Sequence, residues 1–219
     1  GWRHYCLKFV RQGNDRLPLI LTFIFYFIMN ISDSITPLNA LSPLDGRYAS
    51  RAAGLRPFLS EAGFMAHRVE VEVSWLIALS QAGLSELPAF SAAAESALRS
   101  WVRDFSEADA QRIKDIEKKT NHDVKAVEYW LKEKAAGNEE LSAAAEFIHF
   151  ACTSEDINNT SHALMLTRSR DQVIIPALQN LLSMLKDNAR QFAQQPMLAR
   201  THGQPASPTT MATAAMTQG

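Results

Sequence analysis

The chain has 219 residues, of which 47% are hydrophobic, which is enough for one ordinary domain or part of a larger one. Its 22 Lys and Arg nearly balance its 23 Asp and Glu, so the overall charge gives no reason to expect nucleic acid or an anionic membrane as a partner. The two cysteines, Cys6 and Cys152, have neither CxxC nor metal-ligand spacing, which favours a reducing compartment. We therefore expect a cytoplasmic protein without structural zinc, in which any anion binding comes from local placement of side chains.

The N-terminal segment differs from the rest of the chain. Residues 17–29, LPLILTFIFYFIM, are an apolar run that follows several basic residues, as in the start of a secretory signal. The run has 13 residues, whereas a membrane span needs about 20, and no A-x-A cleavage site follows. Met29 then begins an ordinary polar sequence. We predict that residues 1–28 are upstream-translated or foreign sequence; a membrane anchor is the alternative.

Helical periodicity follows over most of the next hundred residues. Apolar residues recur at helical spacing over 59–79, and a second helix is expected at about 89–105. Ser106, with acidic residues directly after it, is typical of the cap and first turn of a third helix. The polar triplet 121–123 marks a helix boundary, and Gly-Asn at 137–138 ends the helix that follows.

The second half of the chain predicts long helices. Residues 140–151 are expected to form an apolar helix, and residues 156–195 are some forty positions with almost no helix breaker. Pro176 should kink this long helix rather than end it. Heptads are poor and charges frequent, which favours a bundle helix over a coiled coil. The prediction is an all-α fold, with an N-terminal helical domain at 29–139, the beginning of a central helical bundle at 140–219, and no convincing strand.

The stretch TSEDINNTSHALML, residues 153–166, concentrates polar side chains where an apolar helix face begins. Thr153 followed by Asp156 fits a capping box, which is the purely structural explanation. One cap does not account for Ser154 and the remaining polar residues together. Because free N–H groups and the helix dipole both favour negative charge, this helix start is a candidate carboxylate or phosphate site.

Three other segments carry candidate chemistry. KKTNHDVKAVEYW, residues 118–130, places His122 beside a carboxylate at a helix boundary, as an acid–base group, an anion donor or simply a cap. RTHGQPASP, residues 200–208, places a histidine beside Gly203 and near two prolines that hold the backbone away from helix, so that histidine is a candidate general acid or base. SPLDGRY, residues 42–48, presents Arg47 and Tyr48 on a glycine-containing turn, and Arg pairs well with carboxylate or phosphate.

Taken in order, SPLDGRY, TNHDVKAVEYWLKEK, EFIHFACTSEDINNTSHALML and RTHGQPASPTTM resemble the bacterial purine-pathway adenylosuccinate lyases. Segments like TSxDxxxT and THGQ also occur across the wider superfamily that includes fumarase, aspartase and argininosuccinate lyase, and the second and third blocks narrow the resemblance. It covers about residues 36–211. It implies a mostly helical subunit of a homotetramer that shares a central bundle. The implied reaction is β-elimination of fumarate from adenylosuccinate, giving AMP, and from a succinylaminoimidazole carboxamide ribonucleotide, with no metal or organic cofactor.

The resemblance also implies roles for individual residues. His202 would be the general acid that protonates the leaving nitrogen, and Gln204 would be a further substrate contact. Arg47 and Tyr48 would contact the nucleotide on its phosphate side. The remaining substrate-binding residues would be Asn121, His122 and Asp123, with His122 assisting proton transfer, and Thr153 and Ser154, which would hold a succinyl carboxylate.

The chain also departs from the family pattern. In the family the base is a serine on a mobile glycine- and serine-rich loop ending in an MPHKVNP-like motif, and each site draws residues from three subunits. This sequence stops before that loop, and residues 212–219 no longer follow the expected helix. We therefore expect the full-length protein to be the lyase and this chain alone to be inactive. The alternatives are another fumarate-releasing lyase, such as argininosuccinate lyase, and a helical fragment that binds full-length subunits.

Overall fold

The computed structural model describes residues 36–213, within two compact units, Gly1–Ala52 and Ala53–Gly219. The predicted extension at 1–28, the apolar run at 17–29 with the membrane-anchor alternative, and the last six residues lie outside the described residues. The described part of the first unit, residues 36–52, consists of turns. Gly46 is buried there, and a Cβ at this position would lie 3.1 Å from both the Ala40 Cβ and the Pro37 carbonyl oxygen, so the turn favours glycine.

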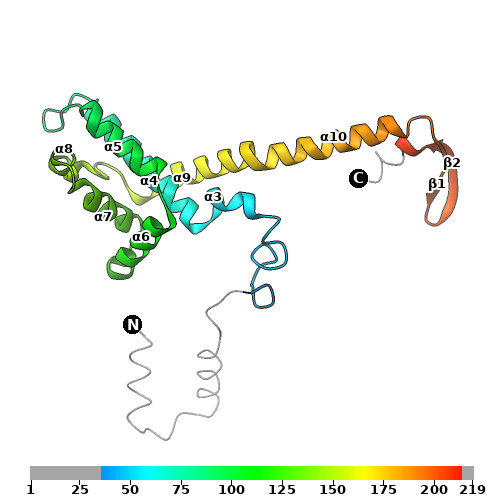
Figure 1. The fold of residues 1–219 in the computed structure, drawn as a ribbon, viewed down its shortest axis with the longest axis horizontal. Helices are drawn as coiled ribbons and strands as arrows, with labels where there is room; N and C mark the ends of the chain where they lie inside the picture. Colours follow the sequence, from blue (N-terminus) through cyan, green and yellow to red (C-terminus); the bar gives the residue numbers. More distant parts are fainter. Residues whose placement is uncertain (1–35, 214–219) are drawn as a thin grey trace, which may run out of the picture. The chain divides into compact units, whose positions relative to one another are not determined.

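The described part of the second unit is mainly helical (Figure 1). Its elements, in chain order, are the 3₁₀ turn η1 (Ala53–Leu55), α3 (Arg56–Leu59), α4 (Glu61–Ser80), α5 (Ala92–Arg103), α6 (Glu107–Thr120), α7 (Asp123–Ala135), α8 (Glu139–Ala143), the 3₁₀ turn η2 (Ala145–Phe147), α9 (Ser154–Ser169), the π-helical turn η3 (Arg170–Ile174), α10 (Ile175–Gln191), β1 (Pro196–Thr201) and β2 (Gln204–Thr210). The predicted mostly helical fold is confirmed.

Side chains at the helix starts explain several of these boundaries. The hydroxyls of Ser60 and Ser91 accept hydrogen bonds from backbone N–H groups in the first turns of α4 and α5, at 3.1 and 3.2 Å. Ser106 and Asp109 form a capping box at the start of α6, as the sequence predicts. Asn138 caps α8 in the same way, at 3.1 Å. Each cap satisfies an N–H that a helix start leaves without an intrahelical partner.

The core gathers around α4, which packs against α5, α7 and α9, while α6 packs against α7. The central residues Val69, Leu98, Ile113 and Val127 come from four different helices and are fully buried. Apolar area removed from water at this junction is the main stabilising contribution to the unit. It also fixes the start of α7 and the start of α9 against the same central helix.

The predicted helix at 140–151 is wrong over most of its length. Helix α8 ends at Ala143, a short 3₁₀ turn follows, and the chain then turns with positive φ values of 65° at His149 and 57° at Ala151. Two long-range contacts hold that turn: the Trp75 indole donates to the Phe150 carbonyl oxygen at 2.8 Å, and a Glu72 carboxylate oxygen lies 2.6 Å from the His149 Nδ1. These tertiary contacts override the local helical pattern.

The long helix predicted at 156–195 is present as α9, η3 and α10, which follow one another along one line in Figure 1. The π-helical turn ends two residues before Pro176, where the ring removes one backbone donor. The expectation that no strand occurs is wrong, because β1 and β2 form an antiparallel hairpin. Pro205 and Pro208 do hold the backbone away from helix, and a two-stranded hairpin tolerates them because both strands are edges.

Candidate functional site

The start of α7 contains three of the residues singled out in the sequence. Asn121 ends α6 in the left-handed conformation with a φ of 51°, and His122 is the N-cap of α7. The Thr120 hydroxyl donates to the His122 carbonyl oxygen at 3.1 Å, which fixes the corner between the two helices. Asp123 begins α7, and its carboxylate accepts from the Val124 N–H at 2.9 Å.

The imidazole of His122 has its two nitrogens in different environments. Nδ1 accepts a hydrogen bond from the Lys125 N–H at 3.2 Å, and it lies 3.7 Å from the Asp123 carboxylate. A ring nitrogen that accepts a hydrogen bond carries no proton, so the neutral ring carries its proton on Nε2. His122 therefore presents an N–H donor on the side away from its own helix.

The start of α9 is built as the sequence predicts. The Asp156 carboxylate accepts hydrogen bonds from both the N–H and the hydroxyl of Thr153, each at 2.7 Å, and the capping box is confirmed. Both bonds lower the pKa of Asp156, and the bond from the Thr153 N–H has the larger effect. Among residues 36–213, the N–H groups of Ser154 and Glu155 have no protein partner.

The two helix starts meet through their polar side chains. The half-buried Ser154 hydroxyl lies 3.5 Å from the His122 Nε2, across 32 positions of sequence. This neighbourhood thus contains three kinds of hydrogen-bond donor: a hydroxyl, an imidazole N–H and the free N–H groups of the first turn of α9. Donors of this kind are complementary to a carboxylate, because the positive end of a helix dipole adds to the hydrogen bonds.

Arg68 of α4 contacts both helix starts from below the surface. One guanidinium nitrogen donates to the Asp123 carboxylate at 2.5 Å and another donates to the Asn158 side-chain oxygen at 2.9 Å. The side chain is only 4% exposed, so its charge depends on these partners rather than on water. Burial acts to raise the pKa of Asp123, but the Val124 N–H and the Arg68 guanidinium together hold that pKa below its usual value.

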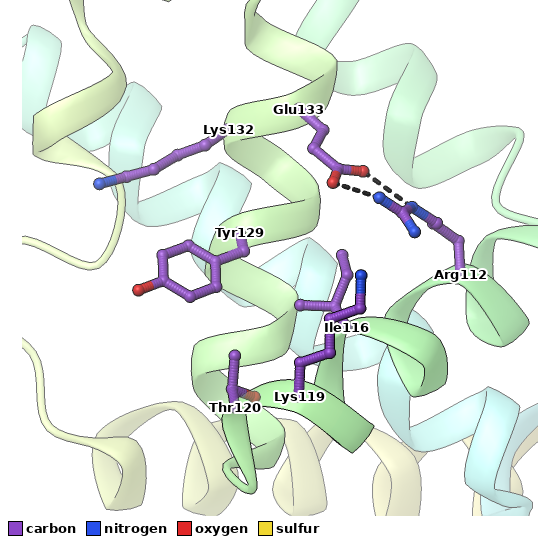
Figure 2. A pocket seen from close by; sticks show the side chains of 7 residues that line it. All are labelled: Arg112, Ile116, Lys119, Thr120, Tyr129, Lys132 and Glu133. Carbon is purple, nitrogen blue, oxygen red and sulfur yellow. Dashed lines mark hydrogen bonds and ion pairs between the residues drawn. The ribbon is translucent and has the colours of Figure 1, made fainter.

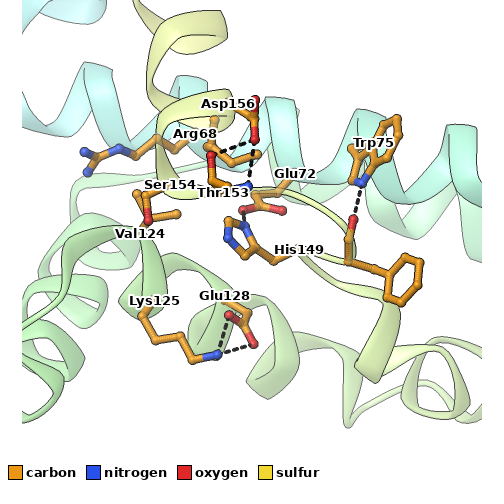
Figure 3. Close-up of polar contacts among 12 residues, drawn as sticks. Arg68, Glu72, Trp75, Val124, Lys125, Glu128, His149, Thr153, Ser154 and Asp156 are labelled. Atoms are coloured by element: carbon orange, nitrogen blue, oxygen red, sulfur yellow. Dashed lines mark hydrogen bonds and ion pairs between the residues drawn. The ribbon is translucent and has the colours of Figure 1, made fainter.

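A second buried pair lies behind the start of α9, where Figure 3 shows Glu72 and His149 pointing toward each other. Glu72 is fully buried, and within the described residues its second carboxylate oxygen has no hydrogen-bond partner. Burial raises the pKa of Glu72, while the contact with His149 opposes that change. The pair holds the turn that leads into Thr153. Its Glu72 is a carboxyl with a shifted pKa close to the candidate site.

The residues of the THGQ segment lie on the hairpin. His202 and Gly203 form its two-residue turn, with φ values of 48° and 78°, and Gln204 begins β2. Positive φ at both central residues is typical of the type I′ turn that suits a tight hairpin. His202 and Gln204 are both exposed.

Within one chain, the hairpin lies too far from Ser154 for His202 to reach it. The helical residues from Ser154 to Gln191 extend on the order of 55 Å at 1.5 Å per residue. The segment from Phe192 to His202 reaches back at most about 40 Å even if fully extended. Within one chain His202 is therefore more than about 15 Å from Ser154, so a site that uses both residues needs more than one chain.

Arg47 and Tyr48 belong to the first unit and are described by themselves. Both are exposed on the turn after Gly46, where the Tyr48 N–H donates to the Pro43 carbonyl oxygen at 2.8 Å. The Arg47 guanidinium carbon lies 5.5 Å from the centre of the Tyr48 ring. The turn thus presents a cation and an aromatic ring together, as the sequence predicts.

Two surface pockets lie along helices of the second unit. A pocket of about 570 Å³ opens between α6 and α7, and Figure 2 shows the ion pair between Arg112 and Glu133 at its side. Lys132, which also lines it, pairs with Glu128 and Glu146, so most of its positive charge is already compensated. A second pocket of about 630 Å³ follows α4 and α9. The second pocket is lined by Cys152 and by Asp156 of the capping box, but neither pocket is lined by His122, Ser154 or His202.

Sequence reasoning missed Arg68, Glu72 and His149 as parts of this neighbourhood. Arg68 and Glu72 are four residues apart on a helix face that also carries Val69, Val73 and Leu76. Two charged residues on an otherwise apolar helix face could have indicated buried polar partners, because charged groups are seldom buried without them. Their partners are 55 to 90 positions away for Arg68 and 77 for Glu72, so local patterns do not identify them.

Among the residues that the structure describes, no helix combines the length and apolar character that crossing a membrane requires. Within the same residues, no group of three or more His, Cys, Asp or Glu side chains is arranged to hold a metal ion.

Comparison with known families and proteins gives a consistent result. The family model described as Lyase matches residues 46–218. Over 178 residues, the chain is 55% identical to an adenylosuccinate lyase of Vibrio cholerae serotype O1 and 56% identical to that of Escherichia coli K12. It is 46% identical over 179 residues to an adenylosuccinate lyase of Legionella pneumophila. Each alignment covers 81% of this chain and 39% of the relative, so the chain spans about two fifths of the length of these relatives.

Solved structures support the fold. A fumarate lyase from Mesorhizobium sp. BNC1 matches with a TM-score of 0.57 at 22% identity, over 74% of this chain and 35% of that structure. A 3-carboxy-cis,cis-muconate lactonizing enzyme from Pseudomonas putida matches with a TM-score of 0.58 at 22% identity, over 75% and 35%. At this level of identity the likeness concerns the fold alone.

Proposed function

Because the chain belongs to the lyase family whose model it matches over residues 46–218, we propose that it is part of an adenylosuccinate lyase. The reaction is β-elimination of fumarate from adenylosuccinate, which gives AMP, and from the succinylaminoimidazole carboxamide ribonucleotide of purine synthesis. The identity of 55–56% to two adenylosuccinate lyases supports this substrate over argininosuccinate. The observation that carries the proposal is the meeting of Ser154 and His122 at two helix starts.

In this proposal the start of α9 holds a carboxylate of the succinyl group. The Ser154 hydroxyl, the free N–H groups of Ser154 and Glu155 and the Nε2–H of His122 are its donors. Thr153 keeps those donors in place, because its own hydroxyl is engaged by Asp156. His122 acts through Nε2 as a donor to substrate, since Nδ1 is occupied by the Lys125 N–H.

The elimination breaks one carbon–hydrogen bond and one carbon–nitrogen bond. A base removes the proton from the succinyl carbon beside a carboxylate, the electron pair forms the double bond of fumarate, and the nitrogen leaves with the C–N electrons. His202 donates a proton to that nitrogen, and a positioned general acid of this kind contributes roughly 10²–10⁴-fold to the rate. Gln204, Asn121 and Asp123 line the substrate, and Arg47 and Tyr48 contact the nucleotide on its phosphate side.

The distance between His202 and Ser154 supports a site shared between subunits, and we propose a cytoplasmic homotetramer. Helix α10 supports this assembly, because it buries no residue of its own and exposes a row of apolar side chains that include Leu178, Leu181 and Leu182. An apolar face of this size marks an interaction surface. Its partners in the proposal are the corresponding helices of other subunits.

The test is complementation, with fumarate release followed by absorbance. This chain is mixed with the full-length Escherichia coli relative carrying alanine at the position equivalent to His202. We expect activity in the mixture above that of either component, because the chain supplies the missing acid. The same chain with His202→Ala is the control and should restore nothing. Absence of activity in a mixture whose components sediment together would refute the proposed role of His202, and activity on argininosuccinate alone would refute the substrate.

A further inference from the structure

Arg68 joins the two segments that form the proposed anion site. Its Nε donates to the side-chain oxygen of Asn158, one turn after Ser154, and one Nη donates to the carboxylate of Asp123, directly after His122. The two partners lie on different helices, α9 and α7, while Arg68 lies on α4. A displacement of either helix start would stretch one of these hydrogen bonds.

The burial of Arg68 makes this connection stiff. The side chain is 4% exposed, and the ring of Phe64 covers one face of the guanidinium, whose carbon is 3.8 Å from the ring centre. A planar guanidinium has its donors at fixed angles, so the two hydrogen bonds set a direction as well as a distance. The charge is also costly to bury unless both partners stay in place.

The ion pair has a second effect on the site. Asp123 is half-exposed and adjoins His122, so an uncompensated carboxylate there would repel an incoming anion. Arg68 compensates that charge from the protein side, and the Asn158 contact adds no charge. The carboxylate directly after His122 therefore does not oppose the hydrogen-bond donors of His122 and Ser154.

We propose that Arg68 is a positioning residue, which holds His122 and Ser154 at the spacing that receives a substrate carboxylate and does not itself touch the substrate. This inference rests on the proposed function. It assigns the specificity for a carboxylate partly to a side chain of α4, outside all the motifs that carry the family resemblance.

The chain offers a matched control in Arg168. Its guanidinium bonds both oxygens of the Glu70 carboxylate at 2.5 and 2.6 Å, so it also joins α9 to α4, but it does so at the opposite end of α9. Replacing either arginine by methionine removes one arginine–carboxylate contact involving α4 and keeps an unbranched side chain. Only the replacement of Arg68 disturbs the starts of α7 and α9.

The experiment measures succinate binding to the 219-residue chain by titration calorimetry. We expect Arg68→Met to weaken binding about tenfold or more, since two buried hydrogen bonds of a charged group are lost. Arg168→Met should change the affinity by less than about twofold, even where it lowers the melting temperature. Arg68→Lys should recover the melting temperature but not the affinity, because an ammonium lacks the planar fork.

Hydrogen exchange provides a readout that does not depend on succinate. Arg68→Met should speed exchange of the hydrogen-bonded amides at the starts of α7 and α9, at residues 124–126 and 156–158, relative to Arg168→Met. If the unmodified chain binds no succinate, the proposed carboxylate site fails, and the exchange comparison then decides the role of Arg68. Equal exchange in these turns for the two methionine variants would overturn the proposal, as would equal loss of affinity or full recovery of affinity by Arg68→Lys.

Discussion

Helices α4 and α7 bury charged side chains, whereas α10 and the hairpin bury nothing. Arg68, Glu72 and Glu128 are each less than 5% exposed, and each has a charged or polar partner. The partners of Arg68 and Glu72 lie on other helices or turns, and those of Glu128 are two lysines of α7 itself. Along α10, β1 and β2 no residue is buried, although α10 carries a row of leucines. The first region packs its charged and apolar side chains within one chain, while the second leaves an apolar face exposed.

The largest expected difference between the two regions concerns the free energy of unfolding. Trp130 of α7 is 2% exposed and meets Phe105 edge to face, with ring centres 5.7 Å apart. Trp130→Ala should lower the free energy of unfolding by about 3–5 kcal/mol, because it leaves a large cavity. Leu181→Ala on α10 should cost less than about 0.5 kcal/mol in the isolated chain. Urea unfolding followed by circular dichroism checks both, and equal losses would contradict the contrast.

Association of chains should depend on the second region. Leu178 and Leu182 lie four residues apart on one face of α10 and are 58% and 51% exposed. Replacing both with glutamate should weaken self-association more than about tenfold, because charge replaces apolar contact area. Asn180→Glu, about 200° around the helix from Leu178, is the control. Sedimentation equilibrium measures the effect, and unchanged association in the double variant would remove α10 from the interface.

A smaller effect is expected at the start of α9. Thr153→Ala removes the hydroxyl of the capping box and should lower the free energy of unfolding by about 1 kcal/mol. Thr167 is exposed within the same helix, and alanine there should be neutral or slightly stabilising because alanine favours helix. Thermal and urea unfolding of the two variants gives the comparison. A loss of the same size at both positions would mean that the cap contributes nothing.

The smallest effect is a local dependence on pH. Hydrogen bonds from Thr153 lower the pKa of Asp156 in the folded chain. A carboxyl with a lowered folded pKa stabilises the fold above the unfolded value near about 3.9, and this contribution is lost as the pH falls through the folded pKa. The protection of the α9 start against hydrogen exchange, taken relative to the intrinsic rate at each pH, should therefore fall below about pH 4. Asp156→Asn should remove this pH dependence, and its persistence in the variant would exclude Asp156 as the cause.

The helices were predictable from the sequence where local signals agree. At α6, the acidic first turn, the Ser106 cap and the apolar spacing all indicate the same boundary, and the structure has it there. At 140–151 the local pattern is helical, but bonds from Trp75 and Glu72 hold a turn with left-handed residues. The hairpin was missed because a short strand with two prolines lacks the alternation on which a strand prediction depends.

The candidate site was predictable as a set of motifs but not as an arrangement. Capping of α9 by Thr153 and Asp156 follows from four adjacent residues, so the sequence contains it. The contact of His122 with Ser154 depends on how α4 packs against α7 and α9, which no local pattern contains. The roles of His202 and Gln204 stay predictions, since these residues lie on a hairpin that does not reach the same neighbourhood within one chain.

The π-helical turn at Arg170–Ile174 sets the rotation about the helix axis between the buried face of α9 and the exposed leucine row of α10. Each residue advances an α-helix by about 100°, so one extra residue in a wide turn rotates everything after it by that amount. The turn thereby changes the angle between the leucine row of α10 and the buried face of α9, which includes Ile157, Ser161 and Met165. If this turn became regular α-helix without losing a residue, the leucine row would rotate by about 100° around the axis, so the wide turn sets the direction of that row without contributing a side chain to it.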